Sequence, residues 1–157
     1  MCIRDRSIAE AQLNEWVEQG FVEWWGRQDR MIKVYHMADI VCFPSYHEGL
    51  PKALLESASC EIPIVAYDVS GCREIVKDKV NGYLIPFKDE NGLYDAVMKL
   101  LNNRSLSRQM GRNGRETVSY THLRAHETDS YRVCLLLVEK IAVKTASSSI
   151  GNIVAVR

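Results

Sequence analysis

The sequence predicts an α/β fold in which a Rossmann-like parallel sheet has helices packed on its faces. Short, continuous apolar runs, such as residues 40–43 and 62–67, are typical of strands that are buried on both faces. Amphipathic patterns of helical length separate these runs. Strand and helix therefore alternate along the chain, which favours a parallel sheet with right-handed crossovers.

The N-terminal part predicts a helix, a strand and a second helix. A capping box at residues 7–10 begins the first helix, and Gly20 suits the position just after its end. The apolar side chains available for one face of this helix are Ile8, Leu13, Trp16 and Val17. A strand is predicted over residues 21–25, ending at Gly26. The second helix has apolar residues at helical spacing, which are Met31, Ile32, Tyr35 and Ala38.

The central part predicts two strands, each followed by a helix. The strand over residues 40–43 closes at a Pro-Ser break, and the next helix begins at Pro51, whose missing N–H is tolerated in a first turn. The strand over residues 62–67 leads to a short helix that we expect Ser70 to cap.

The last predicted elements are one strand and two helices. Asn81-Gly82 is a turn signal before a short strand over residues 83–87. Asp89 is expected to cap a helix, and a further amphipathic helix covers residues 106–117. The apolar stripe of the helix after Asp89 consists of Leu93, Ala96, Val97, Leu100 and Leu101.

Two carboxylates, Glu48 and Glu56, bracket the helix that begins at Pro51. From Pro51, Glu56 lies about 7.5 Å further along the helix axis. A helix N-terminus attracts anions, so a phosphate flanked by two carboxylates suggests a ligand with phosphates and hydroxyls, such as a nucleotide sugar. The spacing alone also fits an ordinary solvated helix. The position just past an apolar strand favours a ligand site, because open α/β sheets bind ligands there.

Residues 38–76 resemble the donor-binding half of the family 4 retaining glycosyltransferases, which have the GT-B fold. The central motif of that family is two glutamates separated by seven residues, as in Glu48 and Glu56. The flanking features that agree are Pro44-Ser45, Gly49, Gly71 and Glu74. The resemblance spans roughly residues 7–117, and it implies that the chain is the truncated C-terminal half of a GT-B fold.

The resemblance implies a role for each glutamate. Glu48 would be the catalytic-site residue that hydrogen-bonds the donor sugar's hydroxyls, and Glu56 would accept bonds from the ribose hydroxyls. The N–H groups of Gly49 and Leu50 could face the phosphate whose charge develops as the donor breaks down. Lys52 is a further candidate for the phosphates, although a surface lysine is an ordinary alternative.

Two further donor-binding candidates lie outside the glutamate motif. Trp25 and Gly26, with Trp24 beside them, resemble the loop that holds the nucleotide base in the family, although both tryptophans also suit a core or a domain interface. Arg73, in the helix that begins near Ser70, could approach the phosphates, whereas a solvated arginine is the common alternative. No metal or other cofactor is expected. His122 and His126, four residues apart, are not interpreted as a metal site.

The composition excludes several other functions. Twenty acidic and twenty basic side chains give a net charge of zero, so no general attraction to nucleic acid is expected. The longest apolar stretch, residues 133–138, is far too short to span a membrane, and the N-terminus lacks the apolar core of a signal peptide. Five cysteines without a C-x-x-C spacing fit a reducing cytoplasm, so we expect the protein there.

Both ends of the chain resemble translated read-through of a sequencing adapter. We expect residues 1–6 to be a non-native head, residues 7–117 a partial nucleotide-sugar-binding domain, and residues 118–157 a non-native tail without a place in the βα pattern. The family's Arg/Lys diphosphate clamp and its acceptor-binding domain lie upstream of the glutamates, so we expect the chain alone not to transfer sugar.

The predicted function is that of a glycosyltransferase fragment from bacterial polysaccharide synthesis. The expected donor is a UDP-sugar. The expected acceptor is a saccharide or lipid-linked saccharide held by the missing N-terminal domain, with the longer protein peripherally associated with the inner face of the cell membrane. Two alternatives stay open: a nucleotide-sugar epimerase of similar fold, and a non-catalytic nucleotide-sugar-binding module.

Overall fold

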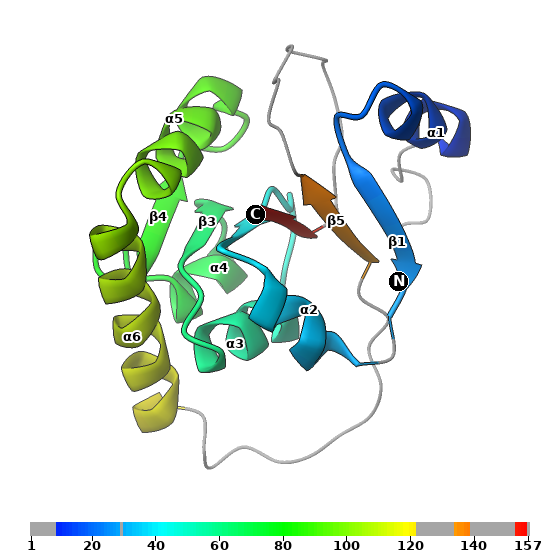
Figure 1. Ribbon diagram of the computed structural model, residues 1–157. Coiled ribbons are helices and arrows are strands. Elements are labelled where there is room, and N and C mark those ends of the chain that lie inside the picture. The colour runs from blue at the N-terminus through cyan, green and yellow to red at the C-terminus, as the bar shows by residue number, and fades with distance from the viewer. Residues whose placement is uncertain (1–8, 29, 122–133, 139–152, 157) are drawn as a thin grey trace.

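The computed structural model describes residues 9–28, 30–121, 134–138 and 153–156 of the 157-residue chain. It has a central sheet with helices against both faces (Figure 1). The helices are α1 (Glu10–Glu18), α2 (Met31–Met37), α3 (Lys52–Ser59), α4 (Ser70–Ile75), α5 (Glu90–Leu101) and α6 (Arg104–Thr121). The strands are β1 (Glu23–Arg27), β2 (Ile40–Phe43), β3 (Ile64–Tyr67), β4 (Gly82–Ile85), β5 (Cys134–Val138) and β6 (Ile153–Val156). The α/β fold class with a parallel sheet and flanking helices is therefore confirmed.

The strand order of the sheet is β1-β5-β6-β2-β3-β4. Strands β2, β3 and β4 pair in parallel, with Val41 opposite Ile64 and Ile64 opposite Gly82. Strands β5 and β6 are parallel to each other and antiparallel to β1 and β2, respectively. Because these two reversals cancel, β1 to β4 all run in one direction. Their carboxyl ends consequently meet at one edge of the sheet.

Alternate residues of the central strands contribute to two separate hydrophobic cores, one on each face of the sheet. Val41 and Ile64 point to the face covered by α2, α3 and α4, whereas Cys42 and Val65 point to the face covered by α5. This alternation explains why the two strands are apolar at every position. In Figure 1, α5 and α6 lie beside β4, and β1 lies on the far side of the sheet.

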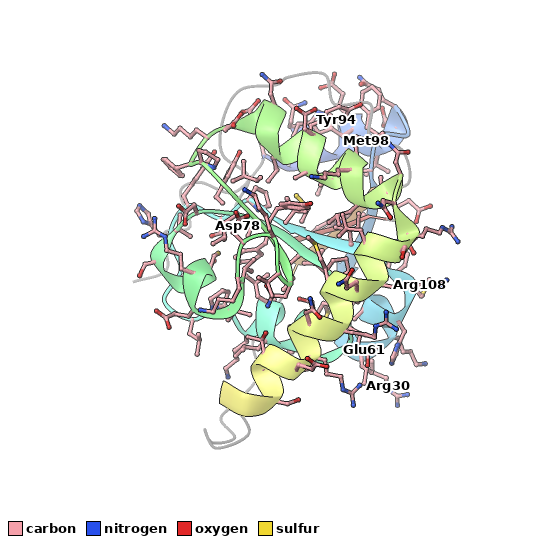
Figure 2. All side chains as sticks on the ribbon, turned by 90° about the vertical axis from the view of Figure 1, so that its left-hand side faces the viewer. Arg30, Glu61, Asp78, Tyr94, Met98 and Arg108 are labelled. Carbon is pink, nitrogen blue, oxygen red and sulfur yellow. The ribbon has the colours of Figure 1, made fainter. Side chains whose placement is uncertain are left out.

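Helix α6 contacts the α3–β3 connection closely. A Cβ atom on Gly111 would lie 1.8 Å from the carbonyl oxygen of Glu61, so only glycine allows this approach. Arg115 forms an ion pair with Glu61 at 3.4 Å, and Figure 2 shows Glu61 beside α6. The helix continues to Thr121, beyond the predicted end at residue 117, and Val118 is buried in the core.

Several predicted boundaries and caps are wrong in detail. Strand β1 runs through Gly26 to Arg27, and β3 begins at Ile64 instead of residue 62. Helix α3 begins at Lys52, with Pro51 in the N-cap position. Ser70 is the first helical residue of α4, so it does not cap that helix. These differences of one or two residues are usual for element ends.

The buried faces of the helices are partly as predicted. Ala96, Val97 and Leu100 of α5 are buried, and Asp89 caps this helix by accepting a bond from the Gly92 N–H at 2.9 Å. Gly20 adopts a φ of 70°, as a residue that ends a helix requires. Ile32, by contrast, is 59% exposed, because Val34 and Tyr35 form the buried face of α2.

Strands β5 and β6 lie in the part of the chain predicted as a non-native tail. They pair within the sheet, which the βα pattern did not predict. The rest of that tail beyond Thr121, with His122 and His126, lies outside the described residues, as does the predicted head. The capping box predicted at residues 7–10 is wrong, because α1 begins at Glu10 with Ala9 in the N-cap position. The predicted domain boundaries stay a prediction.

Candidate functional site

The loop between β2 and α3 carries Glu48 at the carboxyl edge of the sheet. It is packed against the first turn of α4, where a Cβ atom on Gly71 would lie 2.4 Å from the Gly49 carbonyl oxygen and 2.5 Å from that of Glu48. Only a glycine at position 71 lets these two backbones approach so closely. The loop is thus held against the connection that follows β3.

Glu48 is held by a hydroxyl group from its own loop. The buried Ser45 Oγ donates a hydrogen bond of 2.7 Å to Glu48 Oε1. The Glu48 side chain is half-buried, and its charge acts on Cys72 of α4. Burial first, and then the charges of Glu48 and Asp68, raise the pKa of the Cys72 thiol to about 12. Glu48 therefore lies against α4 in a defined orientation.

Glu56 is exposed on α3, one turn from the helix start. The buried Tyr35 hydroxyl of α2 lies 3.1 Å from Glu56 Oε2. From Lys52 to Glu56 the helix rises about 6 Å. One carboxylate therefore precedes the α3 N-terminus and the other follows it.

Three aromatic rings support the start of the Glu48 loop. Tyr46 stacks on Tyr67, at the end of β3, with ring centroids 6.2 Å apart, and meets Phe87 edge-on at 5.1 Å. Tyr67 and Phe87 are also in edge-to-face contact at 6.0 Å. Burial is the main cause that raises the pKa of Tyr67 to about 12. These contacts tie the loop to the ends of β3 and β4.

The other residues predicted around Glu48 lie in the same region. Gly49 and Leu50 are exposed in the loop, with Leu50 48% exposed, and Lys52 is half-buried as the first residue of α3. Pro51, in the N-cap position of α3, makes no side-chain capping hydrogen bond. The structure thus brings Glu48, the loop backbone and the start of α3 together at one edge.

Arg73 lies in α4 and is engaged by a neighbouring acid. Its Nε donates to Asp68 Oδ1 at 2.5 Å, and Nη2 donates to the Asp68 carbonyl oxygen at 3.4 Å. This hydrogen bond holds the pKa of the Asp68 carboxyl below its usual range. Arg73 therefore sits near the end of β3 in an ion pair, and a role with phosphates stays a prediction.

Trp25 and Gly26 lie on a different strand from the one that leads to Glu48. Both lie inside β1, three strand positions from β2, or about 14 Å at the usual strand spacing. Trp25 donates to Glu23 Oε2 at 2.9 Å and packs on the α2–α3 core. An open cavity of about 450 Å³ lies between the end of α1 and β1. Its lining residues are Val17, Gly20, Val22, Glu23, Trp24 and Trp25.

Sequence reasoning missed the two hydroxyl groups that hold the glutamates. Ser45 stands three residues before Glu48, and this local spacing is a signal that could have indicated the bond. Tyr35 stands 21 residues before Glu56, where no local signal exists, because the contact depends on how α2 packs on α3. Within the described ranges, no three His, Cys, Asp or Glu side chains are grouped as metal ligands would be. No described helix has the length and apolarity needed to cross a bilayer.

The chain is similar to known glycosyltransferases. The N-acetyl-alpha-D-glucosaminyl L-malate synthase of Bacillus anthracis is 32% identical over 93 residues, which cover 59% of this chain and 24% of that protein. A Campylobacter jejuni N,N'-diacetylbacillosaminyl-diphospho-undecaprenol alpha-1,3-N-acetylgalactosaminyltransferase is 29% identical over 110 residues, covering 70% of this chain and 29% of that protein.

A solved structure has the same fold in the matched region. The S. aureus protein TarM, solved as a mutant with fondaparinux, alpha-GlcNAc-glycerol and UDP, matches with a TM-score of 0.57 and 28% identity. The match covers 58% of this chain and 19% of TarM. The matched regions thus span 19% to 29% of the length of these proteins.

The family model described as "Glycosyl transferases group 1" matches residues 9–117. This range includes β1 to β4, both glutamates, helices α1 to α5 and the part of α6 up to residue 117. The match covers well over half of the chain. The chain therefore belongs to the group 1 glycosyltransferase family.

Proposed function

We propose that the chain is the donor-binding part of a retaining glycosyltransferase that uses a nucleotide sugar, with UDP as the nucleotide. The observation that carries the proposal is the arrangement at the carboxyl edge, where Glu48 precedes and Glu56 follows an α3 N-terminus whose N-cap residue, Pro51, makes no side-chain capping hydrogen bond. The UDP bound in TarM supports the choice of nucleotide. Because the chain spans less than a third of the length of these relatives, transfer itself is proposed for the longer protein.

In the proposed complex, the diphosphate lies at the start of α3. The helix dipole and the backbone N–H groups of Gly49 and Leu50 stabilise its charge, and Lys52 and Arg73 supply positive charge nearby. Glu56 accepts hydrogen bonds from the ribose hydroxyls. Glu48 accepts bonds from hydroxyls of the donor sugar, which places the anomeric carbon at the edge of the sheet.

The proposed reaction exchanges one bond at the anomeric carbon for another. The bond from this carbon to the β-phosphate oxygen breaks, and UDP leaves with the electron pair. An acceptor hydroxyl oxygen forms the new bond on the same face of the sugar, and its proton passes to the phosphate oxygen of the departing UDP. The rate depends on stabilising the charge of the leaving diphosphate, which is the task of the α3 N-terminus and the cations.

The acceptor is proposed to be a saccharide or lipid-linked saccharide. The Campylobacter jejuni relative, whose name specifies a diphospho-undecaprenol acceptor, supports a lipid-linked substrate. Such an acceptor would bring the longer protein to the inner face of the cell membrane.

Calorimetric titration of the full chain with UDP tests the proposal. We expect wild-type chain to bind UDP and Glu56→Gln to weaken binding by about tenfold or more, the effect of hydrogen bonds to a charged group. The matched control is Glu116→Gln, an exposed glutamate on α6, which should bind as the wild type does. If UDP does not bind, or if both variants bind equally well, the proposed donor site is wrong.

A further inference from the structure

Tyr35 places a buried hydroxyl group next to an exposed carboxylate. The tyrosine is 1% exposed in the core between α2 and α3, and Glu56 lies on the outside of α3. The hydroxyl oxygen lies 3.1 Å from Glu56 Oε2 and 3.3 Å from the carbonyl oxygen of Ala53. The tyrosine therefore connects the core to the surface at one position of the site.

The hydroxyl donates its one proton to the carboxylate. Of the two acceptors, Glu56 is nearer and carries a charge, and charge-assisted hydrogen bonds are the stronger kind. Burial, and then the negative charge of Glu56, raise the pKa of Tyr35 well above its usual range. The phenol thus keeps its proton at neutral pH and stays a donor.

This bond gives an exposed side chain a fixed orientation. A free glutamate loses considerable rotamer entropy when a ligand orders it. Here the Tyr35 bond already fixes Oε2, whereas Oε1 accepts no hydrogen bond from the described part of the chain. A carboxylate held in this way has acceptor positions directed to solvent, which suit two neighbouring hydroxyl groups.

We propose that Tyr35 is a positioning residue that holds the Glu56 carboxylate for the vicinal hydroxyls of a nucleotide's ribose. The proposal rests on the proposed function, since it concerns the same site. It adds that preference for a ribonucleotide depends on a side chain that does not touch the ligand. Tyr35 reduces the entropy that the Glu56 side chain loses when it binds the two hydroxyl groups.

The test compares the affinity of the full chain for UDP and for 2′,3′-dideoxy-UDP, which lacks both ribose hydroxyls. Tyr35→Phe removes only the hydroxyl group and keeps the buried ring. We expect it to weaken UDP binding by about fivefold to tenfold, as for one hydrogen bond to a charged group, and to leave dideoxy-UDP binding unchanged. In a Glu56→Gln chain, Tyr35→Phe should weaken UDP binding no further.

The control is Tyr94→Phe on the surface of α5 (Figure 2), which should change neither affinity.

The outcomes separate this inference from the proposed function. If Tyr35→Phe weakens both ligands equally, its role is structural and the inference is overturned. If Glu56→Gln loses the preference for UDP while Tyr35→Phe keeps it, the inference fails and the donor site stands. If wild-type chain binds no UDP, both fail.

A second measurement does not depend on the stability of Tyr35→Phe. The ¹³Cζ NMR resonance of Tyr35 reports the hydrogen bond made by its hydroxyl. Glu56→Gln should shift this resonance, whereas Glu116→Gln, at an exposed residue of α6, should leave it in place. An unchanged resonance in Glu56→Gln would show that the hydroxyl does not donate to Glu56 and would overturn the inference.

Discussion

The buried hydroxyl of Ser45 determines where the Glu48 carboxylate points. At 2.7 Å from Oε1, it makes a short bond to a half-buried acid, and its own side chain is 5% exposed. Losing one partner leaves the other without its hydrogen bond in a partly desolvated place. The pair should therefore be energetically coupled, although both residues belong to a loop.

A double-mutant cycle measures this coupling. Ser45→Ala should lower the free energy of unfolding by about 1–3 kcal/mol, and it should have a smaller effect in a Glu48→Ala chain. Urea denaturation of the wild type, both single variants and the double variant gives the four values. Additive effects would mean that Ser45 does not hold Glu48.

The buried thiols of Cys42 and Cys72 should be inert in the folded protein. Burial is the first cause that raises the pKa of each thiol to about 12. At pH 8 roughly one part in ten thousand would be thiolate, the reactive form. We expect alkylation at pH 8 to label neither residue in native chain and both in urea, as peptide mass spectrometry can determine.

The same shift makes stability depend on alkaline pH. The pKa of each thiol is higher in the folded than in the unfolded chain. The folded state is therefore favoured in full below the unfolded value near 9 and loses this contribution as pH rises toward about 12. In the alkylation experiment, rapid labelling of Cys42 or Cys72 in the native chain at pH 8 would contradict the burial of these thiols.

At the scale of elements, the approach of α4 to the Glu48 loop depends on Gly71. The matched comparison is Gly114 of α6, where a Cβ atom would meet its nearest neighbours at 3.6 Å, an ordinary contact distance. Gly71→Ala should destabilise the fold and weaken UDP binding, because either the loop or α4 must move. Gly114→Ala should be neutral or stabilising by about 0.5–1 kcal/mol, as for alanine in a helix. Thermal melts and calorimetry measure both variants; equal behaviour would contradict the close approach.

The end of α6 contributes to the core beyond the predicted domain boundary. Val118 is 6% exposed and packs with the α2–α4 side of the sheet. Val118→Ala should lower the free energy of unfolding by about 1–2 kcal/mol, whereas Val80→Ala, at a residue 49% exposed, should change it little. Denaturant unfolding of the two variants distinguishes a core residue from one in a loosely attached tail.

Local sequence signals predicted most helices and strands, but they did not predict the contacts between these elements. Asp89 caps α5 because a cap requires only neighbouring residues, and the apolar runs of β2 and β3 follow from burial on both faces. The start of β3 was predicted two residues early, since the pairing of Ile64 with Gly82 sets where the ladder begins. The sequence pattern likewise placed the Glu48–Glu56 pair but could not show the Tyr35 bond or the Gly71 approach.

Over the whole molecule, the candidate residues fall into two regions of the sheet. Glu48, Glu56 and the start of α3 lie around the ends of β2 and β3, whereas Trp25 and Gly26 lie in β1, with β5 and β6 between. The tail strands could not be predicted, because their pairing with β1 and β2 depends on tertiary contacts and not on the βα pattern. The proposed donor site is therefore centred on the glutamate loop and α3, and not on β1.

An NMR titration of ¹⁵N-labelled chain with UDP tests this central claim most directly. The account predicts that the amide resonances which shift are those of residues 48–56 and 70–72. Glu56→Gln should reduce these shifts, and Glu116→Gln should leave them unchanged. Shifts confined to the cavity between α1 and β1, or no shifts at all, would contradict it.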